Sequence, residues 1–334
     1  MNNLILIEGL PGSGKSSTAH WLHHSFRQSR IPSQWFYELS EFHPLALRSN
    51  ESKISRSQLP TKNIEVWKRF IQSEINECEV VIIDSGFFQK NIMHMMNSNI
   101  EIETIQEYAR QVEDLVSECN THFVYLDAGY AEKHLQRVFR VRGKRFQNAL
   151  TEWSNNTEYS ISKGYVGIEG CLKYWRDYKG LCDRIYERSK LRKIKVGVTN
   201  EPWSDHHQTL SRYLKVSNYN QSNYSPILSG KLTGDYLLRG SDIIVSVAER
   251  SGCFTIKNLL HALEAESLMI PEGSNRFFIR GHDVSLQFEE FRQGIAEVIK
   301  VSSSWNKLNG YVFDRVWSGP VTLTSHCDVI GREK

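Results

Sequence analysis

The stretch Gly9-Leu10-Pro11-Gly12-Ser13-Gly14-Lys15-Ser16 fits the pattern G-x-x-x-x-G-K-[ST] at every fixed position. The apolar residues 4–7 before it read as a short buried strand, and residues 17–22 after it open a helix. Glycines let backbone N–H groups converge on an anion without a Cβ in the way, and a helix that starts near Lys15 points its positive dipole end at the same place. The stretch therefore predicts a phosphate-binding loop rather than a glycine-rich turn that binds nothing.

Such a loop indicates a nucleoside triphosphate and assigns roles within the stretch. Lys15 would reach the β- and γ-phosphates, and the Ser16 hydroxyl would be a ligand of Mg²⁺. The other residues expected to hold the nucleotide are Gly9, Pro11, Gly12, Ser13, Gly14 and Ser17. The loop alone does not say what happens to the nucleotide.

Length and composition indicate a globular chain of about two domains, since 334 residues with 40% apolar residues suffice for ordinary cores. The net charge of +3 gives no reason to expect nucleic acid or a membrane surface as a partner. Six widely spaced cysteines without a C-x-x-C pair favour free thiols over disulfides or zinc. No apolar run approaches the roughly 20 residues that span a bilayer, and we expect a cytoplasmic protein.

Residues 1–216 alternate between strand and helix patterns. Strands are expected at 4–7, 34–37, 80–84, 122–127 and 193–198. Helices are expected at 63–78, 87–98, 101–118 and 131–153, around 174–185, and in a last segment that ends near 216. Because parallel neighbours need a crossover, this alternation predicts an α/β domain with a parallel five-stranded sheet flanked by helices.

The polar residues 217–226 read as a linker, and the pattern changes after them. Short strand candidates separated by turn residues lie at 236–238, 243–247, 254–256, 277–279, 284–288 and 311–313. Residues 227–334 are therefore expected to form an antiparallel sheet or small barrel.

Chemistry should lie at the carboxyl ends of the parallel strands, where open sheets bind ligands. Asp84 ends one strand as a Mg²⁺-holding carboxylate would, and capping the following helix is a compatible role. Glu38 and Glu41 follow another strand, and a kinase that acts on a hydroxyl benefits from a carboxylate that accepts the proton. Glu38 is the first candidate for this base and Glu41 the second. His43 would be a loop histidine or a substrate hydrogen bonder, and the alternative for the whole cluster is a solvated loop.

An arginine-rich segment, with Arg137, Arg140, Arg142 and Arg145, offers a lid over the triphosphate that could close at Gly143. Arg145 would contact the substrate. A solvated basic helix face and a nucleic-acid footprint are the alternatives. Asn200, after the last strand of this domain, would border the base of the nucleotide.

Residues 1–215 resemble the P-loop kinases of the thymidylate-kinase-like superfamily. The resemblance is carried by residues 8–17, by Glu38 and residues 41–44, by Asp84-Ser85-Gly86, and by Arg137 with Arg142-Gly143. It implies a sheet order of 2-3-1-4-5, ATP with Mg²⁺ as the nucleotide, and phosphate contacts from Arg137 and Arg142. True thymidylate kinases carry an Asp-Arg pair where this chain has Asp84-Ser85, and an Asp-Pro-Gly-like motif in place of residues 38–40, so thymidylate is not the expected acceptor.

The C-terminal part is similar to a small lipocalin-like β-domain appended to some serine-hydrolase-type proteins, through residues 232–236 and 277–288. This likeness carries no catalytic residue and implies an accessory role or a role in a homodimer.

The expected function is an ATP- and Mg²⁺-dependent kinase that transfers the γ-phosphoryl group to a small-molecule acceptor, with a hydroxyl favoured. Lys15, Glu38, Asp84, Arg137 and Arg142 would carry the reaction. The alternatives are a nucleoside-monophosphate kinase, a nucleotide-gated protein whose β-domain engages a partner, and, more remotely, a 5′-end polynucleotide kinase.

Overall fold

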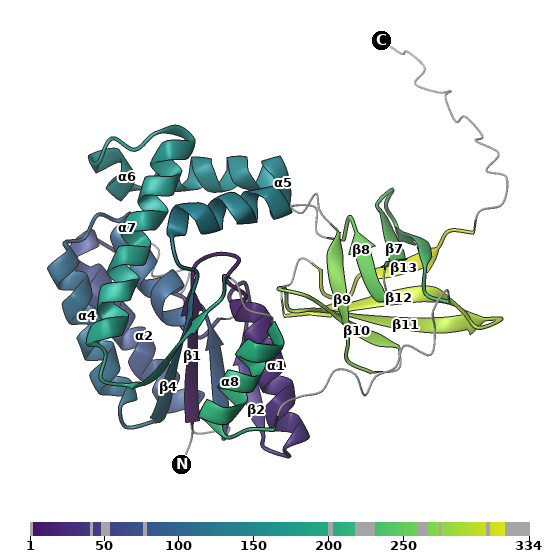
Figure 1. Cartoon of the computed structure of the whole chain (residues 1–334), viewed down its shortest axis with the longest axis horizontal. Helices are drawn as coiled ribbons and strands as arrows, with labels where there is room; N and C mark the ends of the chain where they lie inside the picture. Colours follow the sequence, from purple (N-terminus) through teal and green to yellow (C-terminus); the bar gives the residue numbers. More distant parts are fainter. Residues whose placement is uncertain are drawn as a thin grey trace, which may run out of the picture.

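The computed structural model describes residues 3–40, 43–47, 54–75, 79–199, 203–217, 231–250, 252–259, 266–273, 275–304 and 308–317. The chain forms an α/β unit followed by a β-barrel that lies beside it (Figure 1). The residues of the predicted linker after 217 lie outside this range.

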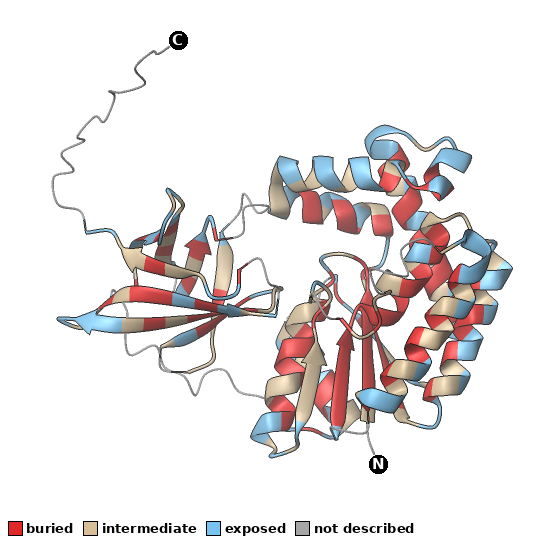
Figure 2. Cartoon of the chain, turned by 180° about the vertical axis from the view of Figure 1, so that it is seen from behind, coloured by how far each residue is buried: buried red, intermediate tan, exposed pale blue. Residues whose placement is uncertain are grey.

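The α/β unit is built on a parallel sheet of five strands in the order β2-β3-β1-β4-β5, as the resemblance implied. The strands are β1 (Asn3–Gly9), β2 (Ser33–Phe36), β3 (Val80–Asp84), β4 (Asn120–Asp127) and β5 (Arg192–Gly197). Every residue of β3 is buried, as is β1 from Leu4 onward, because both faces of the central strands are covered (Figure 2).

Helices cover both faces of the sheet. On one side lie α1 (Lys15–Gln28) and α8 (Trp203–Leu214), and on the other α2 (Leu59–Ser73), α4 (Ile102–Val116) and α7 (Gly167–Arg188) (Figure 1). The prediction for α2 was late by four residues, because a short 3-10 helix, η2 (Arg56–Gln58), starts the turn and leads directly into Leu59-Pro60. Proline is well tolerated in the first turn of a helix, where its missing N–H costs nothing.

Two helical segments around the sheet differ from the expected regular helices. The predicted helix at 87–98 begins instead as the π-helix η3 (Gly86–Ile92) and continues as α3 (Met93–Asn97). The long helix α5 (Ala131–Asn155) is interrupted at Gly143, whose φ of 84° and ψ of 175° are not helical. The glycine that the sequence marks as a hinge is thus the point where the helix breaks. A short helix, α6 (Glu158–Ser162), then leads to α7.

The C-terminal unit is a closed antiparallel barrel of eight strands in the order β10-β11-β12-β13-β6-β7-β8-β9. These are β6 (Gly234–Leu238), β7 (Ile244–Arg250), β8 (Cys253–Lys257), β9 (Ser267–Pro271), β10 (Arg276–Ile279), β11 (Val284–Arg292), β12 (Ile295–Ser303) and β13 (Val312–Arg315). The sequence predicted six of them and missed β9 and β12. Alternate residues point into its core, which is separate from the core of the α/β unit.

Among the described residues, Cys119, Cys171, Cys182 and Cys253 are free thiols, as predicted. No helix in the described part of the chain is both long enough and apolar enough to cross a bilayer.

Candidate active site

The loop between β1 and α1 has the backbone conformation of a phosphate-binding loop. Gly12 and Gly14 have φ values of 76° and 93°, in the left-handed region that favours glycine, and α1 starts immediately after Gly14. A Cβ on Gly14 would lie 1.9 Å from the ring of Trp203, which begins α8. Glycine is therefore required here by conformation and by packing, and the first N–H groups of α1 are left free for an anion.

Helix α5 packs on the same loop and holds it in place. His134 Nε2 donates a hydrogen bond to the Pro11 carbonyl over 2.8 Å, and burial lowers the pKa of His134 to about 4, so that the ring is neutral. A Cβ on Gly12 would lie 2.6 Å from Val138. The arginine-rich segment thus starts in contact with the loop.

Lys15 is almost fully buried, and its ammonium group donates to the Leu10 carbonyl over 3.2 Å. The ammonium therefore lies within the curve of the loop, where a bound phosphate would meet it. The Ser13 hydroxyl and Oε2 of Glu8 are also buried there, and neither has a hydrogen-bond partner.

The donor set around Asp84 fits Mg²⁺. Burial raises the pKa of Asp84 to about 6, with the nearby Glu38 carboxylate acting in the same direction, while Lys15 and hydrogen bonds from Ser16 and Ser85 oppose it. Ser85 donates to Oδ1 of Asp84 over 2.8 Å, whereas the buried Oδ2 has no partner. A carboxylate oxygen without a partner beside a serine hydroxyl is a fitting pair of ligands for this hard cation. Ser16 and Asp84 lie together, and their role as metal ligands stays a prediction.

Glu38 lies close to this pair, in the segment that follows β2. Its Oε1 accepts a hydrogen bond from Gln89 Nε2 over 2.6 Å. The carboxylate interacts electrostatically with two cations, Lys90 and Arg142. Burial lowers the pKa of each of them, and the charge of Glu38 counteracts the effect in both cases. The charges of Glu38 and Lys90 thus act on or respond to that of Asp84, and Arg142 responds to Glu38.

Gln89 and Lys90 were missed by the sequence reading. Both belong to the π-helix η3, which places them after Asp84 on a turn that a regular helical pattern does not describe. π-helical turns are frequent at functional sites, so the signal lies in the backbone rather than in the residue pattern.

The other predicted site residues are distributed around this centre. Arg137 donates to the Thr199 carbonyl over 3.2 Å and contacts His134, on the side of the loop where the base of a nucleotide was expected. Arg142 lies beside Glu38 and covers the Phe146 ring at 4.8 Å, whereas Arg145 is exposed. His43 is buried and accepts a hydrogen bond from the Leu45 N–H over 3.1 Å through Nδ1, which leaves its Nε2 without a partner.

Two predicted site residues, Glu41 and Asn200, lie outside the described residues.

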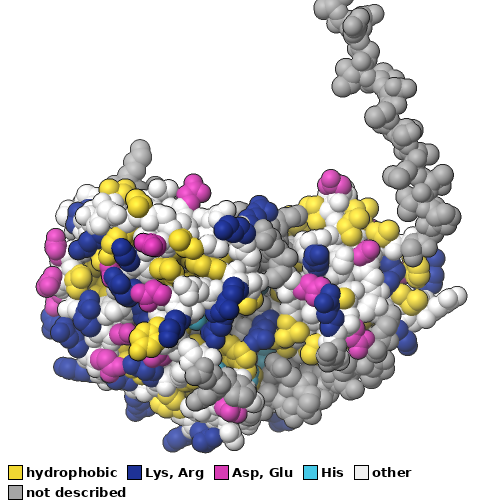
Figure 3. All heavy atoms as spheres, turned by 45° about the horizontal axis from the view of Figure 1, so that its top comes forward, with side chains coloured by type: hydrophobic (Ala, Val, Ile, Leu, Met, Phe, Trp, Pro, Cys, Tyr) yellow, Lys and Arg dark blue, Asp and Glu magenta, His cyan; other side chains and the backbone are white. Residues whose placement is uncertain are grey.

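The barrel reaches the edge of this site, a feature that the sequence did not predict. His282, in the turn between β10 and β11, lies with Nδ1 3.3 Å from the Tyr37 hydroxyl, and Ser304 is hydrogen-bonded to Ser40 over 2.8 Å. Tyr37 and Ser40, the two residues that the barrel contacts here, lie on either side of Glu38 in the sequence. Burial lowers the pKa of His282 to about 4, and the charge of Arg142 adds to this. On the face seen from above, basic side chains extend from the α/β unit to its border with the barrel (Figure 3).

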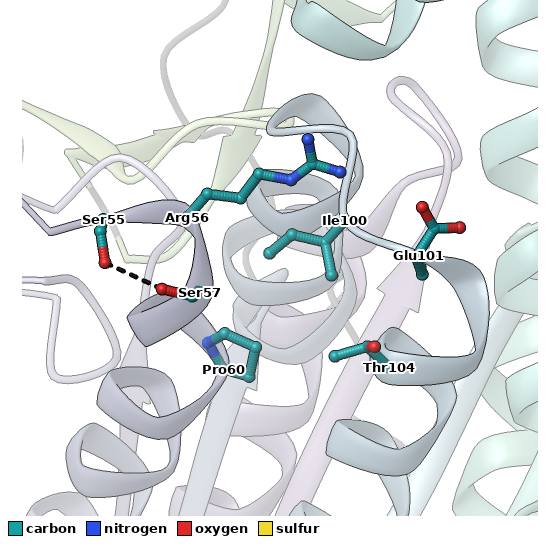
Figure 4. Close-up of a pocket in the computed structure, with 7 residues that line it drawn as sticks. All are labelled: Ser55, Arg56, Ser57, Pro60, Ile100, Glu101 and Thr104. Carbon is teal, nitrogen blue, oxygen red and sulfur yellow. Dashed lines mark hydrogen bonds between the residues drawn. The ribbon is translucent and has the colours of Figure 1, made fainter.

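A separate hollow of about 450 Å³ lies between the start of α2 and the start of α4. Figure 4 shows that Arg56 and Pro60 on one side face Ile100 and Glu101 on the other. It shares no residue with the loop, Asp84 or Glu38, and it is not part of the candidate site.

Searches against protein-family models and against curated proteins found no match. Among solved structures, the chain is similar to the YorR protein of Bacillus subtilis, whose structure contains phosphorylated GDP. The identity is 16%, the alignment covers 64% of this chain and 95% of YorR, and the TM-score is 0.36. A likeness this distant carries no argument about a ligand. The sheet order and the conformation of the loop by themselves describe a P-loop NTPase-like fold.

Proposed function

We propose that the protein is an ATP- and Mg²⁺-dependent kinase that transfers the γ-phosphoryl group to a hydroxyl of a small molecule. The observation that carries the proposal is the position of Glu38. It is a carboxylate at the edge of the phosphate site, next to Asp84, and Gln89 holds it in one orientation. A carboxylate in this place can accept the proton of an acceptor hydroxyl during phosphoryl transfer. Nucleotide binding without transfer would not need such a group.

In this proposal each residue has a defined task. Lys15 and the loop N–H groups bind the phosphates, and Ser16 with Asp84 holds Mg²⁺, which supplies charge neutralisation on the transferred group. Glu38 accepts the proton of the acceptor hydroxyl. The hydroxyl oxygen then forms the new bond to the γ-phosphorus, and the bond between this phosphorus and the leaving oxygen of ADP breaks. Arg142 neutralises charge that develops on the phosphoryl oxygens. Water is excluded when the segment on either side of Gly143 closes over the site.

A nucleoside-monophosphate kinase is the second candidate, and a specific observation favours it. Lys90 and Arg142 place two positive charges around Glu38. An acceptor phosphate is already ionised and needs positive charge rather than a base. In that case Glu38 would orient the two cations instead of accepting a proton.

The test is a panel of nucleosides, nucleoside monophosphates, sugars and aminoglycoside-like compounds, incubated with the full chain, ATP and Mg²⁺. ADP release and the mass of the product are measured. A phosphorylated hydroxyl supports the proposal, a nucleoside diphosphate supports the second candidate, and ATP hydrolysis without any acceptor contradicts both in favour of a nucleotide-gated protein.

One variant and its control test the role of Glu38. With a hydroxyl acceptor, Glu38→Gln should lower kcat by about 10²-fold or more while binding of a non-hydrolysable ATP analogue is kept. Glu103→Gln is the matched control, because it makes the same carboxylate-to-amide change at an exposed position of α4. Near-normal turnover of Glu38→Gln would remove the base from the mechanism.

A further inference from the structure

Three metal-ligand side chains converge where α1 faces the barrel. His20 and His24 come from α1, and Glu272 comes from the turn that follows β9. Their Nε2 atoms lie 2.7 Å and 3.0 Å from the same oxygen, Oε1 of Glu272, and one ligand atom from each residue lies within 4.8 Å of the others. The i, i+4 spacing puts the two imidazoles on one face of the helix, where they can share one ligand.

The cluster is enclosed on its inner side and open on its outer side. The side chains of His20 and Glu272 are 5% and 8% exposed, whereas that of His24 is 22% exposed. An ion can therefore reach the cluster past His24, and water can occupy a ligand position on that side.

Neighbouring groups fix the orientation of these side chains. The second oxygen of Glu272, Oε2, accepts hydrogen bonds from Ser285 Oγ over 2.8 Å and from Arg276 Nε over 3.2 Å, which leaves Oε1 directed at the histidines. The His20 ring stacks on Phe278 with 3.4 Å between ring centres and 8° between planes. Outer partners of this kind are what hold metal ligands in place.

We propose that His20, His24 and Glu272 bind a Zn²⁺ ion that clasps the barrel to the helix that follows the phosphate-binding loop. Two imidazoles and one carboxylate, with water as a fourth ligand, are a ligand set that Zn²⁺ takes in proteins, and nitrogen ligands disfavour Mg²⁺ and Ca²⁺. Tetrahedral bonds of about 2.0–2.1 Å place the ligand atoms roughly 3.3 Å apart. The observed separations of 2.7 Å and 3.0 Å would have to widen by roughly 0.6 Å and 0.3 Å to reach this value.

The proposed site is independent of the proposed kinase reaction. It uses none of the residues assigned to nucleotide, metal or acceptor there, and it ties the barrel to α1 at a point five residues after Lys15. A hydrogen-bonded cluster without a metal would make the same contacts, so the experiment has to separate these two cases.

The experiment uses the full chain after treatment with a chelator and measures binding of Zn²⁺ by calorimetry and of Co²⁺ by visible absorption, which reports a tetrahedral site. The variants are Glu272→Gln and His24→Ala. The control is His23→Ala, since His23 neighbours the cluster but is hydrogen-bonded to Ser33 instead.

We expect one tight site per chain in the natural protein and in His23→Ala, and binding at least about tenfold weaker in both cluster variants. Equal affinity in all four proteins would show that Zn²⁺ binds adventitiously at other histidines and would overturn the proposal, as would the absence of any binding at tens of micromolar Zn²⁺. His24 is partly exposed, so His24→Ala remains informative even if Glu272→Gln does not fold.

Discussion

Glu8 makes the stability of this protein depend on pH in an unusual range. The residue lies near the end of β1 and is fully buried. Its Oε1 accepts a hydrogen bond from the Phe87 N–H over 2.7 Å, and Oε2 has no partner. Burial raises the pKa of this carboxyl from 4.5 to about 8, against the opposing effects of the Phe88 N–H, of Lys15 and of the Phe87 N–H.

The direction follows from the two pKa values. The folded chain binds the proton of Glu8 more tightly than the unfolded chain, so its contribution to stability is complete below about pH 4.5 and is lost as the pH rises through about 8. Between these values the free energy of unfolding should fall by about 1.4 kcal/mol per pH unit. Across the whole interval the loss is on the order of 5 kcal/mol, as an upper bound.

The perturbation is Glu8→Gln, which keeps the shape and removes the titration. Urea unfolding is followed by tryptophan fluorescence from pH 5 to pH 9, without nucleotide, for both proteins. The difference between the free energies of unfolding of the two proteins reports the titration of Glu8, because Asp84 and the other groups titrate in both proteins and cancel. We expect the natural protein to lose stability relative to the variant by several kcal/mol over this range. Parallel curves would refute the reasoning and mean that the carboxyl is hydrated in solution.

Three further changes test the packing. Gly14→Ala should weaken binding of an ATP analogue by at least about tenfold in calorimetry, because the new Cβ collides with Trp203 and the φ of 93° is strained. Trp67→Phe should cost about 1–3 kcal/mol more in urea unfolding than Trp21→Phe, since the Trp67 indole N–H donates to Asn91 and Tyr108, whereas that of Trp21 has no acceptor among the described residues. A chain ending at residue 217 should fold as an α/β unit, with a melting temperature several degrees lower in calorimetry because the face under the barrel becomes exposed.

The α/β unit was largely predictable because its signals are local. The loop, its flanking strand and the continuous apolar run of β3 each decide their own conformation. The order of the strands does not follow from any such signal, and it came from the resemblance to a family. Boundaries failed where backbone geometry departed from the regular helix, as in η3, whose π-helical turn has no pattern of apolar spacing.

The two barrel strands that were missed lack the alternation that marks a half-buried strand. In β9 only Met269 is buried, and the strand ends in a proline. In β12 the neighbouring residues Val298 and Ile299 are both buried, which interrupts the period of two. Closure of the barrel supplied the pairing that made these segments strands.

The candidate site was predictable only in part, for a related reason. Asp84 ends β3 and Glu38 comes soon after β2, so the carboxyl edge of the sheet brings them together whatever else the chain does. Lys90, Gln89 and His282 reach the site through a π-helix and through a second unit. No spacing within the sequence relates a residue near 282 to one near 38.

Helix α1 shows why a second unit lies against this one. The successive residues His20 and Trp21 lie on different faces of this helix, and both are buried. Trp21 stacks on His207 of α8 with 4.1 Å between ring centres, while His20 is covered by Phe278 of the barrel. A helix has one face for its own sheet, so a second buried face needs a further partner. The barrel is that partner, and because α1 begins at Lys15, any force that shifts the barrel acts on the helix that presents the phosphate-binding loop.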